Sequence, residues 1–346
     1  MDKIILEKKN HSIMHVGCDF GIANELSDFF SFFVPGYKYM PAFRNKVWDG
    51  KIRLFNVQSN EIHVGLYPFI KDFAAKRNYE IEISDENNYG SPDDKDDIDP
   101  KAIMDFISSL EIQSRGKPIQ VRDYQFNGIC HGLHNKRSIL VSPTGSGKSL
   151  IIYVLIKYYL SMLSSGIQKV LIVVPTTSLV DQMYNDFADY GMLVENGCHK
   201  IYSGKEKMTN AAVVISTWQS IYKLPGKWFE QFGCVIGDEC HGFKSKSLNS
   251  IMNKAREAEY RWGTTGTLDG TQTHELVLQG LFGKIYNVTT TKKLQDNDTL
   301  AKLNISVIKL KYPEELRKNR GTQTYQEEID LIVRNESRNK FIRNLA

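Results

Sequence analysis

The chain has 346 residues, of which 41% are hydrophobic, and a formal net charge of +4. This length allows more than one domain, and the slightly basic balance is compatible with nucleic-acid binding without requiring it. There is no run of eighteen or more apolar residues and no long apolar segment of a signal peptide at the amino terminus, so we expect a cytoplasmic protein without a membrane span.

The segment 37–53 interleaves aromatic and cationic residues. Cations bind phosphates regardless of base sequence, and aromatic rings can stack on exposed bases. The same pattern also fits a small core that buries Trp48, Ile52 and Phe55 while the cations face solvent. The two interpretations are compatible if apolar side chains point inward and basic ones outward. The candidate DNA contacts are Arg44, Lys46, Lys51 and Arg53.

The segment 85–99 holds seven acidic residues, one lysine and almost no apolar residue. Such a segment buries too little surface to offset its ordering entropy, which predicts an exposed linker. A solvated surface turn inside one domain is an equally good interpretation, because the amphipathic stretch 98–112 follows closely. We expect a small α+β accessory domain that binds DNA over 1–112, a second domain over 113–290, and a connector with the start of a further lobe over 291–346.

Beyond Lys117, short β-branched runs alternate with polar loops and helical stretches. Near-continuous apolar runs are typical of parallel strands that are buried on both faces. The alternation predicts an α/β fold with a parallel sheet, whose ligands bind at the carboxyl ends of the strands. The expected strands are 138–141, 169–174, 212–216, 234–236 and 260–265.

The segment 142–149 fits the phosphate-loop pattern, although Ser142 replaces the usual first glycine. Gly145 and Gly147 allow backbone N–H groups to turn toward phosphate oxygens, and Lys148 supplies a positive charge to them. The lysine, and the lack of a third glycine, argue against a dinucleotide-binding fold. The expected ATP contacts are Thr144, Gly145, Ser146, Gly147, Lys148 and Ser149, and the Ser149 hydroxyl is also a candidate Mg²⁺ ligand.

The predicted strand 234–236 leads into two adjacent carboxylates, Asp238 and Glu239. Asp238 would hold Mg²⁺, while Glu239 would orient and deprotonate the attacking water. Acidic turns at strand ends are common, but a phosphate loop 90 positions earlier favours ATP hydrolysis, with Lys148 and Glu239 as catalytic residues.

Further along, 303–310 alternates like a strand and 325–345 is predicted to be helical.

The segment 238–241 resembles the DExH box of superfamily 2 helicases, and other motifs of that family's first lobe occur in the expected order. The resemblance implies that Gln125 reads the adenine and that His241 links the ATP site to motion. It also implies contacts with the nucleic-acid backbone and a coupling of nucleotide state to strand contact. The implied backbone contacts are Thr176, Thr217 and Gln219, and the implied coupling residues are Thr265 and Thr267.

The segments 43–55 and 324–329 resemble bacteriophage helicases of this superfamily that act on branched DNA. This resemblance implies a RecA-like P-loop NTPase lobe preceded by a small α+β domain. It further implies an ATP-dependent DNA helicase that migrates branches and unwinds or anneals duplexes in recombination and repair. The implied partners are branched DNA, duplex/single-strand junctions and a second RecA-like lobe in the same or another chain.

Superfamily 2 motors have two lobes, and the second supplies arginine fingers. Nothing after Thr267 resembles those motifs, so we expect a shortened or split form that binds ATP and DNA but hydrolyses ATP slowly. Three alternatives stay open at this point. They are a nucleic-acid-binding module that no longer cycles ATP, an RNA helicase, and the motor of a restriction system.

Overall fold

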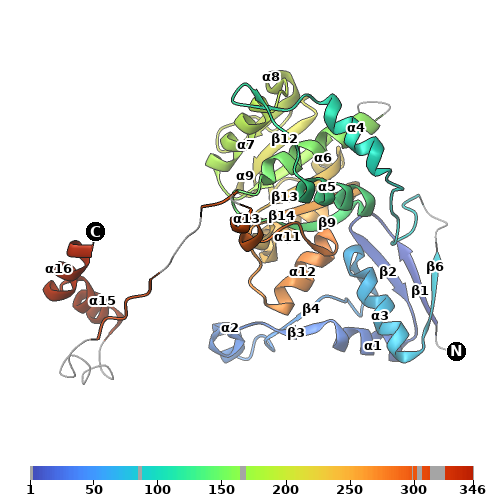
Figure 1. Ribbon diagram of the computed structural model, residues 1–346. Helices are drawn as coiled ribbons and strands as arrows, with labels where there is room; N and C mark the ends of the chain where they lie inside the picture. Colours follow the sequence, from blue (N-terminus) through green and yellow to red (C-terminus); the bar gives the residue numbers. More distant parts are fainter. Residues whose placement is uncertain are drawn as a thin grey trace. The chain divides into compact units, whose positions relative to one another are not determined.

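The computed structural model describes most of the chain, and its residues form two compact units, Met1–Leu300 and Ala301–Ala346. The described residues are 3–84, 88–163, 169–297, 299–301, 306–311 and 324–345. The first unit holds two main sheets with their helices, and the second holds the helices α15 and α16 (Figure 1). Among the described helices, none is both long and apolar enough to cross a membrane.

The amino-terminal part of the first unit is an α+β domain built on a sheet with the order β5-β2-β1-β6. Alternate side chains of β1 are buried, as in a sheet that has one covered face. Helices α1 and α3 cover that face, and Leu6, Leu26 and Phe73 share one core. The elements are β1 (Lys3–Lys8), β2 (Ile13–Gly17), α1 (Phe20–Phe29), β5 (Glu61–His63), η2 (Val64–Leu66), α3 (Tyr67–Arg77) and β6 (Glu80–Ser84).

A projecting segment, residues 31–53, interrupts this domain, and we call it the arm. Its base is an antiparallel pair of short strands, and a turn and a short helix form its tip, which extends away from the sheet (Figure 1). The elements of the arm are β3 (Ser31–Phe33), η1 (Tyr37–Tyr39), α2 (Pro41–Arg44) and β4 (Lys51–Arg53).

Residues 88–99, which we call the acidic strap, have no helix or strand but are held against the rest of the first unit. The ammonium of Lys136 lies 2.8 Å from an Asp94 oxygen, 3.1 Å from an Asp96 oxygen and 2.7 Å from a Glu259 oxygen. The hydroxyl of Tyr260 donates a hydrogen bond to Asp96. These contacts favour a fixed surface turn over a free linker for the described part of the acidic segment. The elements that follow are α4 (Pro100–Ser109), β7 (Gln113–Ser114) and β8 (Lys117–Pro118).

The larger sheet has seven strands in the order β11-β12-β10-β13-β14-β9-β15, and all its neighbouring pairs are parallel. This arrangement confirms the predicted RecA-like α/β lobe. The strands are β9 (Arg137–Val141), β10 (Lys169–Val174), β11 (Cys198–Ile201), β12 (Val213–Thr217), β13 (Phe232–Asp238), β14 (Tyr260–Thr265) and β15 (Ile285–Asn287). The five predicted strands agree with β9, β10, β12, β13 and β14 to within two residues at each end.

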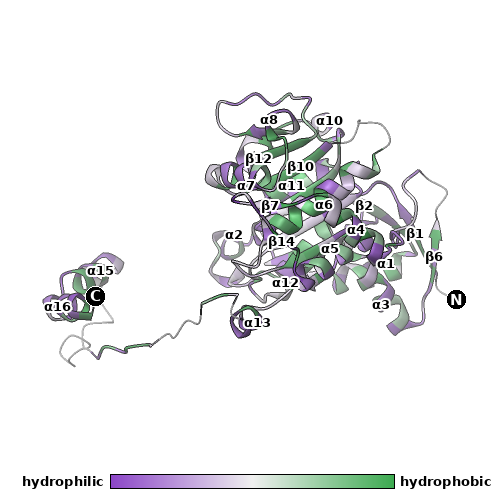
Figure 2. Cartoon of the chain, turned by 45° about the horizontal axis from the view of Figure 1, so that its top comes forward, coloured by the Kyte–Doolittle hydropathy of each residue, from purple (hydrophilic) through white to green (hydrophobic). Residues whose placement is uncertain are grey.

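Both faces of the large sheet are buried, and Figure 2 shows its strands as largely hydrophobic. In β10, Ile172 belongs to one core together with α5, α6 and α7, whereas Leu171 and Val173 belong to the core beneath α9 to α12. The helices are α5 (Asp123–Asn135), α6 (Lys148–Met162), α7 (Thr177–Asp189), α8 (Val194–Gly197), α9 (Trp218–Ile221), α10 (Gly226–Phe229), η3 (Cys240–Lys244), α11 (Lys246–Lys254), α12 (Gln272–Phe282) and α13 (Thr291–Asp296).

The small domain is joined to the large lobe by a backbone-to-backbone contact. A Cβ atom on Gly65 of η2 would overlap the carbonyl oxygen of Gln279 in α12 and lie 2.7 Å from that of Gly280. The side chain of Leu276, also in α12, is part of the small domain's core. The side chain of His63 bonds to Asn253 of α11 over 2.8 Å. The two domains therefore share one packed interface, while the predicted boundaries at 112 and 290 remain a prediction.

The carboxyl-terminal expectations were partly wrong. The predicted strand at 303–310 is absent from its described part, 306–310, and 302–305 lie outside the described residues. The predicted helix over 325–345 is present as two helices, α15 (Tyr325–Val333) and α16 (Glu336–Leu345). Asn335 starts the second helix by accepting a hydrogen bond from the Arg338 N–H, which explains the break.

Candidate nucleotide site

The phosphate loop connects the carboxyl end of β9 to the first residue of α6, as predicted. Gly145 and Gly147 have φ angles of +80° and +83°, a region that glycine adopts without strain. Lys148 begins α6, so the positive end of the helix dipole faces the loop. The Ser146 hydroxyl lies 2.6 Å from the Ser142 hydroxyl, so the serine in the first-glycine position braces the loop from inside.

Gln125 of α5 is buried against this loop. Its Nε2 donates to the carbonyl of Ser146 over 2.8 Å, and its Oε1 accepts from the Arg122 N–H over 2.9 Å. A Cβ on Gly147 would overlap the Gln125 amide, so the glycine is needed to admit that side chain. The hydroxyl of Tyr124 also donates to the Ser146 carbonyl, over 3.1 Å. The helix that carries Gln125 is therefore attached directly to the phosphate loop.

The two carboxylates at the end of β13 have different surroundings. Asp238 is 7% exposed and accepts a hydrogen bond from the Thr264 hydroxyl over 2.7 Å. Burial raises the pKa of the Asp238 carboxyl, because the charged form loses its hydration. Glu239 is half-buried and has a φ of +49°, which turns its side chain out of the strand and toward the loop.

A connected set of polar side chains runs from the phosphate loop to β14. The Lys148 ammonium lies 3.3 Å from Glu239 Oε1, and His241 Nδ1 lies 3.4 Å from Glu239 Oε2. The same His241 nitrogen lies 3.0 Å from the Thr265 hydroxyl, which donates to the carbonyl of Thr267 over 2.9 Å. The structure thus brings together the predicted catalytic residues and the two predicted coupling residues.

The two residues predicted to hold a metal are each bonded to other side chains. Asp238 is bonded to Thr264, and the Ser149 hydroxyl lies 3.0 Å from the Tyr190 hydroxyl. Burial raises the pKa of the nearby Asp186 carboxyl, and its hydrogen bond with Ser149 opposes that rise. Ser149 therefore interacts with the end of α7 in this structure, and its role as a metal ligand stays a prediction.

The residues that would contact a nucleic-acid backbone lie at the carboxyl ends of β10 and β12, which are neighbouring strands. Thr176 and Gln219 are exposed, and the Gln219 amide donates to the carbonyl of Pro175 over 3.4 Å. Thr217 is only 4% exposed, and its hydroxyl lies 2.9 Å from that of Ser220. Thr176 and Gln219 are therefore the accessible members of this predicted surface.

In the arm, the basic side chains differ in exposure and in ion pairing. Arg44 and Lys46 are exposed and make no ion pair with any described residue, whereas Arg53 is paired with Asp49. The Lys51 ammonium lies 5.1 Å from the centre of the Phe33 ring. Of the residues that the core interpretation would bury, Phe55 is buried in the small domain's core, whereas Trp48 and Ile52 are only half-buried, so that interpretation holds for Phe55 alone.

Sequence reasoning missed Thr264, Tyr190 and Leu300. Thr264 bonds to Asp238 from a position 26 residues away, and its only signal was its place beside Thr265 in the predicted strand. Leu300 lies against the phosphate loop, where a Cβ on Gly145 would come within 2.7 Å of it. No local sequence pattern marks Tyr190 or Leu300, because their contacts depend on how distant segments pack.

Two protein-family models match the chain. Residues 3–84 match the model of the amino-terminal domain of DNA helicase UvsW, and residues 99–270 match that of the type III restriction enzyme res subunit. The chain is 37% identical to the ATP-dependent DNA helicase uvsW of Enterobacteria phage T4 over 97% of its length, and it spans 66% of that protein. It is also 31% identical over 166 residues to the DNA 3'-5' translocase XPB2 of Sulfurisphaera tokodaii, covering 34% of it.

Solved structures of the phage T4 protein are similar to this chain as well. One crystal structure of the UvsW helicase has a TM-score of 0.74 and 36% identity, covering 82% of this chain and 99% of that one. Another has the same TM-score and 34% identity, covering 99% of this chain and 67% of that one. The likeness includes the small domain as well as the large lobe. The chain therefore belongs to the UvsW family of superfamily 2 helicases.

Proposed function

We propose that this protein is an ATP-dependent DNA helicase that acts on branched DNA in recombination and repair, in the compartment that holds the DNA. The observation that carries the proposal is the set of contacts from Lys148 through Glu239 and His241 to Thr265. It connects the phosphate loop to β14, whose carboxyl end lies at the same edge of the sheet as those of β10 and β12, where the predicted nucleic-acid contacts lie. The family membership and the name of the phage T4 relative support DNA as the substrate.

In this proposal the ion pair between Lys148 and Glu239 breaks when ATP binds, and each side chain takes a new partner. Lys148 is paired with Glu239 over 3.3 Å, and the γ-phosphate would compete for the lysine because it carries more negative charge. The released Glu239 carboxylate would then orient the attacking water and accept its proton. His241 and Thr265 contact that carboxylate from the other side, so its movement would be passed to β14.

The residues at the site fit a Mg²⁺ ion. Mg²⁺ usually binds one or two carboxylates together with phosphates and water, rather than an all-protein cage. Among the described residues no group of three or more acidic, histidine or cysteine side chains could hold a metal, and Asp238 offers a single buried carboxylate beside the loop. Bound Mg²⁺ would offset phosphate charge, with Asp238 and Ser149 as its protein ligands.

We further propose that a second RecA-like lobe completes the site, either in the same polypeptide or from another chain. Lys148 is the only cation found within 4 Å of Glu239 or Asp238 among the described lysines and arginines. One cation leaves much of the triphosphate charge to be balanced, and arginine fingers contribute about 10³ to 10⁵ in rate in other NTPases. Slow turnover by this chain alone is therefore expected.

The test is to measure nucleotide binding and ATP hydrolysis by the 346-residue chain with duplex, forked and junction DNA and with RNA. We expect ATP binding and slow turnover that branched DNA stimulates most. Lys148→Ala should weaken binding and abolish turnover, whereas Glu239→Gln should abolish turnover and keep binding. Lys157→Ala, on the same helix, is the matched control.

Each other outcome contradicts a separate part of the proposal. Turnover that survives in either Lys148→Ala or Glu239→Gln would remove those residues from the catalytic site. Stimulation by RNA but not DNA would exclude a DNA motor. Turnover at motor rates by the isolated chain would exclude the need for a second lobe.

A further inference from the structure

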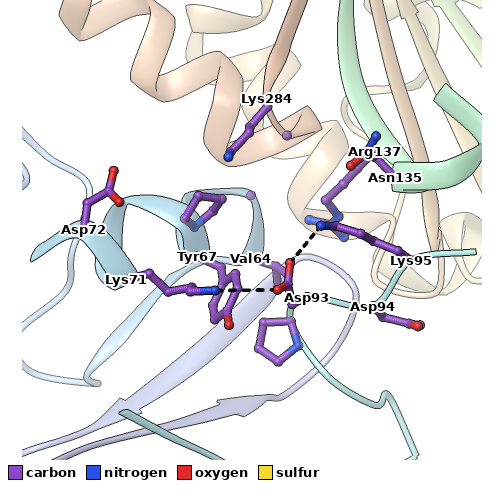
Figure 3. Close-up of a pocket in the computed structure, with 14 residues that line it drawn as sticks. Val64, Tyr67, Lys71, Asp72, Asp93, Asp94, Lys95, Asn135, Arg137 and Lys284 are labelled. Carbon is purple, nitrogen blue, oxygen red and sulfur yellow. Dashed lines mark ion pairs between the residues drawn. The ribbon is translucent and has the colours of Figure 1, made fainter. Parts of the chain in front are cut away.

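A pocket of about 280 Å³ lies between the small domain, the acidic strap and the large lobe (Figure 3). Its walls come from η2 and α3, from residues 92–95 of the strap, and from the segments around Arg137 and Lys284. Arg137 is the first residue of β9, whereas the phosphate loop follows the last residue of that strand. The pocket is therefore at the opposite edge of the sheet from the nucleotide site, and none of the residues described there lines it.

Four cationic side chains line this pocket, and one carboxylate lies among them. Asp93 is 3.9 Å from the Lys71 ammonium and 3.6 Å from that of Lys95, and Figure 3 shows its carboxylate between the two. Lys284 and Arg137 are the other two cations. Of the two remaining acidic residues in the lining, Asp94 is paired with Lys136 outside the pocket, and Asp72 points away from Asp93 (Figure 3). The cations thus exceed the free negative charge.

Arg137 is the least satisfied member of this group. Its Nη2 donates to the carbonyl of His11 over 2.7 Å, while its Nη1 is buried with no hydrogen-bond partner among the described residues. Burial lowers the pKa of Arg137 to about 10. Nη1 itself is closed to solvent, so Arg137 contributes positive charge to the wall of the pocket, and positive charge favours an oxyanion as the ligand.

We propose that this pocket binds a phosphate group, and that the Asp93 carboxylate occupies part of that site in the free protein. Ammonium and guanidinium groups on three sides suit a tetrahedral dianion better than a single carboxylate. The volume suits a phosphate with little attached, because sites for larger organic ligands start at about 300 Å³. The phosphate belongs either to a small free compound or to a DNA backbone that passes the rim of the pocket.

The experiment measures pyrophosphate binding by calorimetry in the Lys148→Ala chain, so that the nucleotide site contributes little. Asp93→Asn removes the internal competitor and should tighten binding about tenfold, which corresponds to one unit of log Kd. Lys71→Gln combined with Lys284→Gln should weaken binding at least tenfold. Lys76→Gln, on the same helix as Lys71 but outside the pocket, should leave it unchanged.

A 20-base-pair duplex, titrated against the same variants, distinguishes the two sources of phosphate. If Asp93→Asn tightens duplex binding as well, the ligand is the DNA backbone; if it tightens only pyrophosphate binding, the ligand is a small phosphate compound. Equal pyrophosphate affinity in the parent chain and Asp93→Asn would overturn the proposal, and so would full binding by a folded Lys71→Gln, Lys284→Gln chain. Should the double variant fail to fold, Asp93→Asn alone decides, because its side chain stays nearly the same size. ATP turnover in chains that keep Lys148 tests the proposed function separately.

Discussion

At the scale of single residues, His11 shows how strongly packing can lower the pKa of a side chain. Burial, followed by the nearby charges of Lys8 and Arg137, lowers the pKa of His11 to about 2. Its Nδ1 has no hydrogen-bond partner among the described residues, and its ring meets the ring of Tyr89 edge-on, with 5.3 Å between centroids. The folded protein therefore holds this imidazole neutral in a cationic environment.

The lowered pKa of His11 predicts that the protein loses stability in mild acid. Below pH 6.5 the unfolded chain binds a proton at His11 that the folded chain does not bind, so the free energy of unfolding falls with falling pH. Between pH 6.5 and 5 the parent chain should lose about 1–2 kcal/mol more than His11→Phe, because each pH unit contributes about 1.4 kcal/mol. Urea unfolding at both pH values measures this. His199→Gln, in β11, is the control, and equal losses in the parent and His11→Phe would contradict the lowered pKa.

The sequence predicted well those site residues that belong to motifs at strand ends. Lys148 and Glu239 follow β9 and β13, whose carboxyl ends share one edge of the sheet, so their meeting could be expected. The bonds of Ser149 to Tyr190 and of Lys136 to the acidic strap could not be expected from the sequence. They join positions 40 or more residues apart, and they depend on packing that no local pattern encodes.

At the scale of elements, the inner strands of the large sheet were predictable and its two edge strands were not. β10 and β14 are buried along nearly their whole length; β10 appears in the sequence as an apolar run, and β14 combines aromatic and β-branched residues with Arg261 and Gly263. β11 and β15 lie at the two edges of the large sheet, are only four and three residues long, and carry polar residues such as Lys200 and Asn287. Edge strands bury less surface, so selection for an apolar pattern is weaker there.

The arm is the element whose function is most directly testable. Its exposed cations Arg44 and Lys46 make no ion pair in the described part of the chain, so they are free to bind phosphates. Arg44→Glu with Lys46→Glu should weaken duplex binding about tenfold or more at low salt. The slope of log affinity against log salt should become about 2 units shallower, because each phosphate contact contributes about 0.9.

Fluorescence anisotropy at several salt concentrations measures both effects. Lys76→Glu with Lys101→Glu makes the same change of charge on α3 and α4, outside the arm, and serves as the control. If the arm variant and the control have the same affinity and slope, the arm does not hold DNA.

At the scale of the whole first unit, the contact at Gly65 decides whether the two domains act as one body. Gly65→Ala would push its Cβ into the backbone of α12, and neither backbone can move without disturbing a core. We expect the variant to lose about 1–3 kcal/mol of stability, the usual cost of overpacking, and to become cleavable between the domains. Thermal unfolding and limited proteolysis measure the two effects.

Gly226→Ala is the matched control, because a Cβ there would meet no atom within 4 Å. An unchanged unfolding midpoint together with an unchanged cleavage pattern in Gly65→Ala would show that the domains are not locked at this point. No feature of the sequence pointed to Gly65, since its neighbour in space, Gln279, is more than two hundred positions away.

The Gly65 contact also gives the molecule a mechanical property. The arm leads through β4 and β5 to η2, and η2 touches α12 without an intervening side chain. α12 in turn packs on β9 and β14, the strands that carry the phosphate loop and Thr265. Under the proposed function, tension on DNA held by the arm would reach these strands through stiff backbone instead of flexible side chains. The rate of ATP turnover by such a motor would therefore depend on the tension in the bound DNA, and the force would pass through the contact at Gly65.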